Sequence, residues 1–129
     1  ILNDIINKQE VIANQKHITI DNYITDEQIY IGKSALKIIL SNVIGNAVKY
    51  TDEHGTITIK SESRWLKVTN TCSKAHELDT TKVFDVNCDL NKENSNGLGL
   101  YIVRNLLNNY KIDAVIETNE KSVTFKIKL

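Results

Sequence analysis

The sequence NVIGNAVKYT at residues 42–51 completes a segment, Lys33 to Tyr50, that the hydrophobic pattern predicts to be a helix. Its apolar residues recur at intervals of four, three and four positions: Leu36, Leu40, Val43 and Ala47. This spacing is typical of a helix that turns one stripe towards a protein core. We therefore expect the rest of the chain to pack around this helix.

Three polar residues of the same helix, Asn42, Asn46 and Lys49, follow one another at intervals of four and three positions and share an adjoining face. A carboxamide oxygen can ligate Mg²⁺ without adding charge, and Mg²⁺ prefers few protein oxygens together with phosphate oxygens and water. A lysine one turn further on can then meet a phosphate as a point charge. On the helix alone, a solvated face with ordinary asparagines is an equal alternative.

A second motif, Gly97-Leu98-Gly99-Leu100, stands at the predicted start of another helix, with Asn96 as a suitable cap. The two glycines would let backbone N–H groups approach a phosphate, because the unpaired donors and the positive dipole end of a helix attract anions. A Gly-x-Gly pair can also mark an ordinary helix start. The helix is expected to bury its apolar residues, Leu98, Ile102 and Leu106, with Val103 and Leu107 beside them.

The remaining segments predict a single α+β domain over residues 1–129. A short helix is expected at Asn3 to Asn14, with Ile5, Ile6, Gln9 and Ile12 on its inner side. Extended segments are expected at His17–Asp21, Gln28–Ile31, Thr56–Glu62, Trp65–Thr69, Asp113–Thr118 and Ser122–Leu129, the last two as a hairpin around Asn119-Glu120. This order predicts a two-layer sandwich, with helices on one face of a mixed, mostly antiparallel sheet.

Between the two motifs, residues 73–96 are polar apart from Val83-Phe84. A loop of this length without regular structure is usually functional, so we expect a lid over a ligand.

The run Asn-x-x-x-Asn-Ala-x-Lys-Tyr-Thr at residues 42–51 resembles the N box of the ATP-binding domain of bacterial sensor histidine kinases. These kinases are a branch of the ATPase superfamily that includes gyrase, Hsp90 and MutL, and the segment 95–103 resembles their G2 box. The similarity covers nearly the whole chain and implies their Bergerat-type ATP-binding fold. It also implies that Asn46 ligates Mg²⁺, that Lys49 lies near the phosphates of ATP, that Tyr50 flanks the nucleotide, and that Gly97, Leu98, Gly99 and Leu100 contact it.

Two departures from the family pattern concern chemistry. Hydrolysing members of the superfamily carry a Glu four residues before the metal-binding Asn, where this chain has Asn42, which cannot act as a general base at neutral pH. This favours transfer of the phosphoryl group to a protein over its transfer to water. In the G1 box, Asn70 replaces the Asp that accepts a hydrogen bond from adenine, and Cys72 replaces the first glycine, so nucleotide affinity or base preference is expected to differ.

Thr124 stands where relatives often place a hydroxyl near adenine, although an outward Thr in a strand needs no function. Likewise, Asn70 could simply cap the end of a strand.

The composition bounds the partners of this domain. Sixteen basic and sixteen acidic residues balance, so the chain has no overall charge to attract nucleic acid or an anionic membrane. Cys72 and Cys88 lack the paired spacing of a zinc site and are expected to be reduced thiols in the cytosol. No apolar run reaches the roughly 20 residues that span a bilayer. The start at Ile1 and the absence of Met predict a piece of a longer protein.

The resemblance implies that this piece binds Mg-ATP and donates the γ-phosphate to a histidine on a separate dimerisation domain of the same protein. A response regulator would be the downstream partner, and the domain would be cytoplasmic in a parent held in the cell membrane. Two alternatives remain: a stand-alone regulatory relative such as an anti-sigma serine kinase, or a degenerate interaction module that has lost nucleotide binding together with the G1 glycines.

Overall fold

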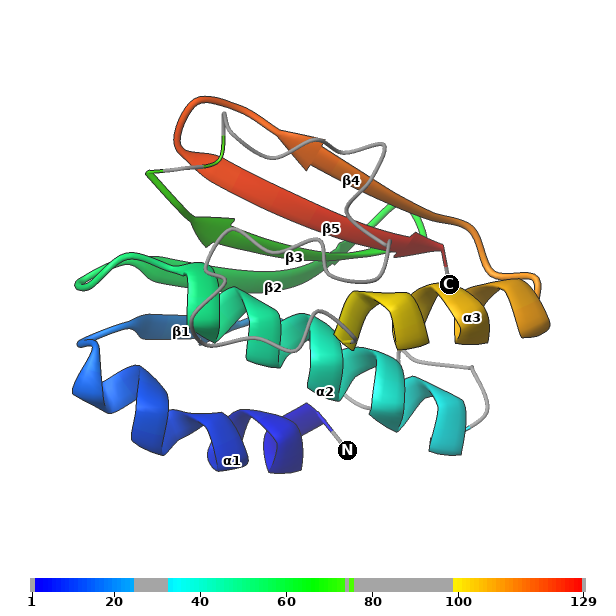
Figure 1. Cartoon of the computed structure of the whole chain (residues 1–129), viewed down its shortest axis with the longest axis horizontal. Helices are drawn as coiled ribbons and strands as arrows, with labels where there is room; N and C mark the ends of the chain where they lie inside the picture. Colours follow the sequence, from blue (N-terminus) through cyan, green and yellow to red (C-terminus); the bar gives the residue numbers. More distant parts are fainter. Residues whose placement is uncertain (1, 25–32, 74, 76–98, 129) are drawn as a thin grey trace.

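The computed structural model describes residues 2–24, 33–73, 75 and 99–128 (Figure 1). The elements in chain order are α1 (Leu2–Gln15), β1 (Thr19–Asn22), α2 (Lys33–Tyr50), β2 (Thr56–Glu62), β3 (Trp65–Thr71), α3 (Gly99–Asn109), β4 (Ala114–Thr118) and β5 (Ser122–Lys128). The predicted segment Gln28–Ile31 lies outside the described residues, and so does the predicted lid apart from Ser73 and Ala75. Among the described helices, none combines the length and the apolar character that crossing a bilayer requires.

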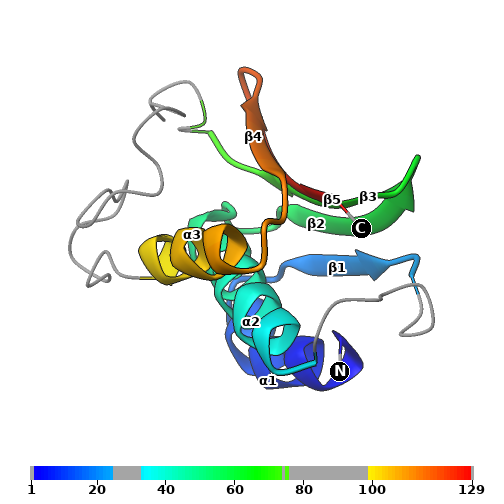
Figure 2. The same ribbon diagram turned by 90° about the vertical axis from the view of Figure 1, so that its right-hand side faces the viewer.

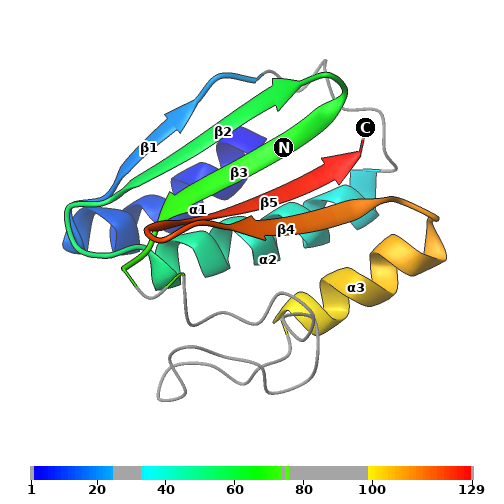
Figure 3. The ribbon, with the colours of Figure 1, turned by 90° about the horizontal axis from the view of Figure 1, so that it is seen from above.

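The described strands form one five-stranded sheet in the order β1-β2-β3-β5-β4. The β1–β2 pair is parallel, and the other three pairs are antiparallel. Figures 2 and 3 show the described helices together on one face of this sheet, with α2 between α1 and α3. The structure therefore confirms the predicted α+β sandwich of two layers with a mixed, mostly antiparallel sheet.

The core lies between α2 and the inner face of the sheet. The predicted stripe of α2 is buried at Leu40, Val43 and Ala47. Ile39, Ile44 and Val48 are buried as well, because α1 and α3 cover the two flanks of the helix. The sheet contributes alternate residues to this core, as the period of two requires: Ile57 and Ile59 from β2, Leu66 and Val68 from β3, and Phe125 and Ile127 from β5.

The inner faces of α1 and α3 differ from the prediction by one residue. In α1, Ile12 is 48% exposed, and Ala13 beside it is 1% exposed. In α3, Ile102 is 42% exposed, whereas Val103 is fully buried. Adjacent helical positions point about 100° apart, so where two neighbours are both apolar the packing against α2 decides which one faces inward.

The ends of α1 and α3 share one type of turn. His17 and Lys111 both have left-handed backbone angles, with φ of 55°. The amide of Ile18 then donates to the carbonyl of Ala13 at 2.8 Å, and the amide of Ile112 donates to that of Leu107 at 2.8 Å. These bonds close the helices in Schellman motifs. The turn at His17 is the reason that β1 begins at Thr19 and not at the predicted His17.

Replacing Gly45 in the middle of α2 by alanine is expected to stabilise the domain. A Cβ at this position would have Gln9 Nε2 as its nearest neighbour, at an ordinary contact distance of 3.6 Å. Alanine in a helix interior is favoured over glycine by about 0.5–1 kcal/mol. Urea denaturation should therefore show a higher midpoint with an unchanged slope, and a lower midpoint would mean that α1 packs too closely on α2 at this position to admit a Cβ.

Candidate functional site

The predicted polar face of α2 is present in the structure. Asn42, Asn46 and Lys49 are all half-buried on one side of the helix. The amide nitrogen of Asn42 donates to the backbone carbonyl of Ile38 at 2.9 Å. That bond uses an N–H group and leaves the carboxamide oxygen, the atom that could ligate a cation, outside it.

The last turn of α2 combines a cation with an aromatic ring. Lys49 Nζ lies 5.6 Å from the centroid of the Tyr50 ring, within the range of a cation–π interaction. Both side chains are half-buried. This end of the helix therefore offers a positive charge and a flat apolar surface next to the two asparagines.

Asn70 is a buried polar residue on the helix-facing side of β3. It is 6% exposed and shares its face of the strand with Leu66 and Val68. Within the described part of the chain, its side-chain amide makes one long hydrogen bond, 3.5 Å to the carbonyl of Thr71. Buried carboxamides are usually hydrogen-bonded more fully than this, so Asn70 has donor and acceptor capacity for a ligand.

Thr124 lies on the opposite face of the sheet from Asn70, and its place near adenine stays a prediction. In the register of β3 and β5, Thr69 pairs with Thr124, whereas Asn70 pairs with Val123. The hydroxyl oxygens of Thr69 and Thr124 are 3.0 Å apart. Because successive side chains alternate between faces, Val123 lies on the same side of β5 as the buried Phe125, and Thr124 lies on the outer side.

The end of α2 and the end of β3 are joined through Asp52. One carboxylate oxygen of Asp52 accepts from the backbone amide of Ser73 at 2.7 Å, and the other accepts from the hydroxyl of Ser73 at 3.1 Å. These bonds place the polar face of α2 and Asn70 at the same end of the core. Composition indicated Asp52 only as a turn residue, because its partner lies 21 positions away.

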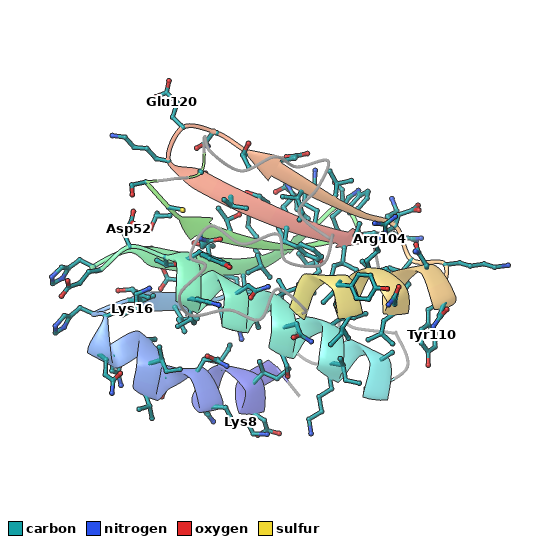
Figure 4. All side chains as sticks on the ribbon, in the orientation of Figure 1. Lys8, Lys16, Asp52, Arg104, Tyr110 and Glu120 are labelled. Atoms are coloured by element: carbon teal, nitrogen blue, oxygen red, sulfur yellow. The ribbon has the colours of Figure 1, made fainter. Side chains whose placement is uncertain are left out.

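Lys16 is a further residue at this end that the sequence did not single out. Its ammonium donates to the carbonyls of Val48 and Lys49, at 2.9 and 3.0 Å. Burial lowers the pKa of Lys16, and the charges of Asp52 and Cys72 oppose that shift. Figure 4 shows Lys16 and Asp52 at the same end of the molecule, beside the last turn of α2.

The second predicted motif is described only in part. Gly99 and Leu100 are the first residues of α3, while Gly97 and Leu98 lie outside the described residues. The helices α2 and α3 pack together and run in opposite directions (Figure 1). The first turn of α3 is thus directed to the side of the molecule where α2 ends, with the polarity that suits an anion.

A hollow of about 720 Å³ lies next to this end of the core, lined by Asp52, Thr71, Ser73, Glu120 and Lys121. Among the residues that the structure describes, none of the predicted site residues lines this hollow. Cys72, at the position of the first G1 glycine, is buried, and its amide donates to the carbonyl of Lys121 at 2.8 Å. Among the described residues, no three His, Cys, Asp or Glu side chains gather as a metal site.

Comparison with known proteins relates most of the chain to one family. Residues 32–129 match the family described as "Histidine kinase-, DNA gyrase B-, and HSP90-like ATPase". The sensor histidine protein kinase HK06 of Streptococcus pneumoniae, in strains D39 and R6, is 34% identical over 134 residues. That alignment covers 100% of this chain and 30% of HK06, so the chain spans about a third of the curated relatives that it matches.

Solved structures of histidine kinases share the fold. The catalytic domain of the histidine kinase ThkA has a TM-score of 0.75 at 21% identity, covering 98% of this chain and 89% of that one. For the Acinetobacter baumannii histidine kinase AdeS the TM-score is 0.67 at 17% identity, covering 98% of this chain and 61% of that one. Full-length ShkA in complex with AMPPNP has a TM-score of 0.66 at 20% identity, covering 98% of this chain and 28% of that one.

Proposed function

This chain belongs to the histidine kinase-, DNA gyrase B- and HSP90-like ATPase family, and we propose that it is the ATP-binding, catalytic domain of a sensor histidine kinase. It binds Mg-ATP and donates the γ-phosphate to a histidine on a separate dimerisation domain of the same protein. The similarity to HK06 over the whole chain supports this choice within the family. The relatives and structures named above are histidine kinases, and no observation on this molecule favours the anti-sigma kinase or the interaction module.

The observation that carries the proposal is the location of two polar groups at the same end of the core. Asn70 supplies a buried carboxamide from β3, and α2 supplies Asn42, Asn46 and Lys49. An amide oxygen can accept from the exocyclic amino group of adenine while its NH₂ donates to a ring nitrogen. We therefore assign adenine to Asn70 and the phosphates to the polar face of α2.

The phosphate end of the site fits Mg²⁺ by its donor set. Asn46 offers a neutral oxygen, and ATP itself supplies the phosphate oxygens that Mg²⁺ prefers. The bound metal would neutralise charge that develops on the phosphoryl group. Lys49 adds a positive charge from the next turn, and backbone amides at the start of α3 add donors. Gly97, Leu98, Gly99 and Leu100 are assigned to this part by their motif.

Asn42 disfavours water, compared with a histidine, as the acceptor of the phosphoryl group. A carboxamide cannot take a proton from water at neutral pH, so this position cannot activate a hydrolytic water as a carboxylate would. Phosphoryl transfer depends mainly on positioning and charge neutralisation, and an incoming imidazole needs no such base. The site is therefore expected to phosphorylate a histidine while hydrolysing little ATP alone.

The proposal extends to the parent protein. The phosphoacceptor histidine belongs to a dimerisation domain outside this chain, and a response regulator receives the phosphate from it. The parent is anchored in the cell membrane, and this domain lies on the cytoplasmic side, where ATP is available. HK06 is named as a sensor kinase, and this chain corresponds to 30% of its length.

Titration of this domain with a non-hydrolysable ATP analogue, with and without Mg²⁺, tests the function. We expect binding that requires Mg²⁺. Asn70→Ala should weaken it about tenfold, because two hydrogen bonds to adenine, each worth roughly 0.5–1.5 kcal/mol, are lost. Thr124→Ala is the matched control and should leave the affinity unchanged, since its hydroxyl lies on the far face of the sheet with Thr69.

No binding at millimolar nucleotide would overturn the proposal. A loss with Thr124→Ala instead of Asn70→Ala would move adenine to the other face of the sheet. In the full-length protein, labelled phosphate from ATP is expected on the acceptor histidine.

A further inference from the structure

We propose that Lys16 is a positioning residue for the phosphate end of this site, an inference that rests on the proposed function. Its ammonium donates to the carbonyls of Val48 and Lys49 at 2.9 and 3.0 Å. The last four carbonyls of any helix lack partners within the helix. Lys16 therefore holds the final turn of α2, which carries Lys49 and Tyr50, without being part of that helix.

The hydrogen bonds around this turn divide its carbonyls between Thr51 and Lys16. The carbonyl of Ala47 accepts from both the amide and the hydroxyl of Thr51, so the chain's own continuation satisfies it. The next two carbonyls, of Val48 and Lys49, are those that Lys16 serves. A positive charge at this position also suits the negative dipole end of α2. The backbone of Lys49 is thereby fixed from outside, which sets the direction of its Cα–Cβ bond.

Lys16 is itself anchored to the turn that follows α2. Its carbonyl accepts from the amide of His54 at 2.9 Å. The ring of the next residue, His17, stacks on that of His54, with centroids 4.9 Å apart and planes within 7°. The end of α1 therefore contacts the α2–β2 connection through both a backbone hydrogen bond and a stack of two side-chain rings. A displacement of α1 would be transmitted to Lys49, so α1 and the phosphate site are mechanically linked.

The test compares Lys16→Met with Lys16→Arg. Methionine keeps an unbranched apolar stem of similar length but has no donor, whereas arginine can still donate to two carbonyls. We expect Lys16→Met to weaken Mg²⁺-dependent binding of the ATP analogue about tenfold and Lys16→Arg to restore it to within about threefold. AMP, which is held mainly by adenine, should bind Lys16→Met and the unchanged protein equally.

Two controls separate positioning from general stability. Lys67→Met makes the same chemical change on the outer face of the sheet, where Lys67 pairs with Glu62 at 3.2 Å. Ile127→Val trims the core beside Leu66, far along the strands from Asn70. Both variants should melt earlier yet bind the ATP analogue normally. Equal losses of ATP analogue and AMP in Lys16→Met, or no loss of either, would overturn the inference.

Hydrogen exchange, measured without nucleotide, tests independently whether Lys16 stabilises the last turn of α2. The amide of Thr51 donates to Ala47 in the turn that Lys16 holds, at 2.9 Å. Its hydrogen exchange should be at least about tenfold faster in Lys16→Met than in Lys16→Arg, because local opening of this turn becomes easier. Unchanged exchange would refute the role of Lys16 even if no nucleotide bound. Failure of the unchanged protein to bind ATP would instead refute the proposed function.

Discussion

Asn46→Ala is expected to lower Mg²⁺-dependent affinity for an ATP analogue by about 100-fold or more. Loss of groups that merely orient metal ligands already costs about 10–100-fold in metal affinity or activity, and the alanine variant removes a proposed ligand itself. The residual binding should no longer respond to Mg²⁺. Calorimetric titration of both proteins, with Mg²⁺ and with a chelator, measures the two effects together.

Two further variants make the Asn46 result specific. Asn105→Ala is the same change at an exposed position of α3 and should leave binding intact. Asn46→Asp keeps an oxygen ligand of the same size and should retain part of the Mg²⁺ response. If Asn46→Ala bound the analogue with the metal dependence of the unchanged protein, Asn46 would not be the ligand, and Asn42 would be the next candidate on the same face.

Gly55→Ala is expected to destabilise the domain by about 1–3 kcal/mol, through overpacking of a position where the surroundings cannot easily yield. A Cβ there would overlap Thr71 Oγ1 and would lie 2.5 Å from Thr51 Cγ2 and 2.8 Å from the carbonyl of Asp52. Thr51 is buried, and the carbonyl belongs to the backbone. The turn between α2 and β2 would have to open.

Urea denaturation measures the effect of Gly55→Ala, and Gly45→Ala is its natural counterpart because the same substitution should there raise the midpoint. Opening of the turn would also disturb the bond between Asp52 and Ser73 that joins the end of α2 to the end of β3. Nucleotide affinity is therefore expected to fall along with stability. A midpoint equal to that of the unchanged protein would mean that the turn accommodates a Cβ at residue 55 without cost.

The spacing of Leu40, Val43 and Ala47 predicted their burial correctly, because helical periodicity is a local property. The same reasoning failed for Ile12 and Ile102, since each has an apolar or small neighbour that could equally face inward. The bounds of β2 were predicted correctly, and β3 extends two residues beyond the predicted Thr69.

In the candidate site, proximity within one helix was predictable from the sequence, whereas contacts between distant segments were not. Asn42, Asn46 and Lys49 share a face because they belong to one helix, so their spacing alone predicts their proximity. The face that Thr124 occupies depends on the strand register, because a shift of one residue along a strand changes the face. The partnership of Asp52 with Ser73 had no signal in the sequence at all.

The sequence by itself determined the family, the order of helices and strands, and the motifs that mark a nucleotide site, because periodicity, turn chemistry and motif spacing are written in neighbouring residues. The tertiary structure alone decided which contacts join distant segments. Lys16 reaches carbonyls 32 and 33 positions away, and the burial of Asn70 depends on the helical layer that covers β3. Such contacts follow from how α1 and α2 pack on the sheet. The partner of a side chain across the core is set by the relative placement of whole helices and strands, and not by the neighbouring residues in the chain.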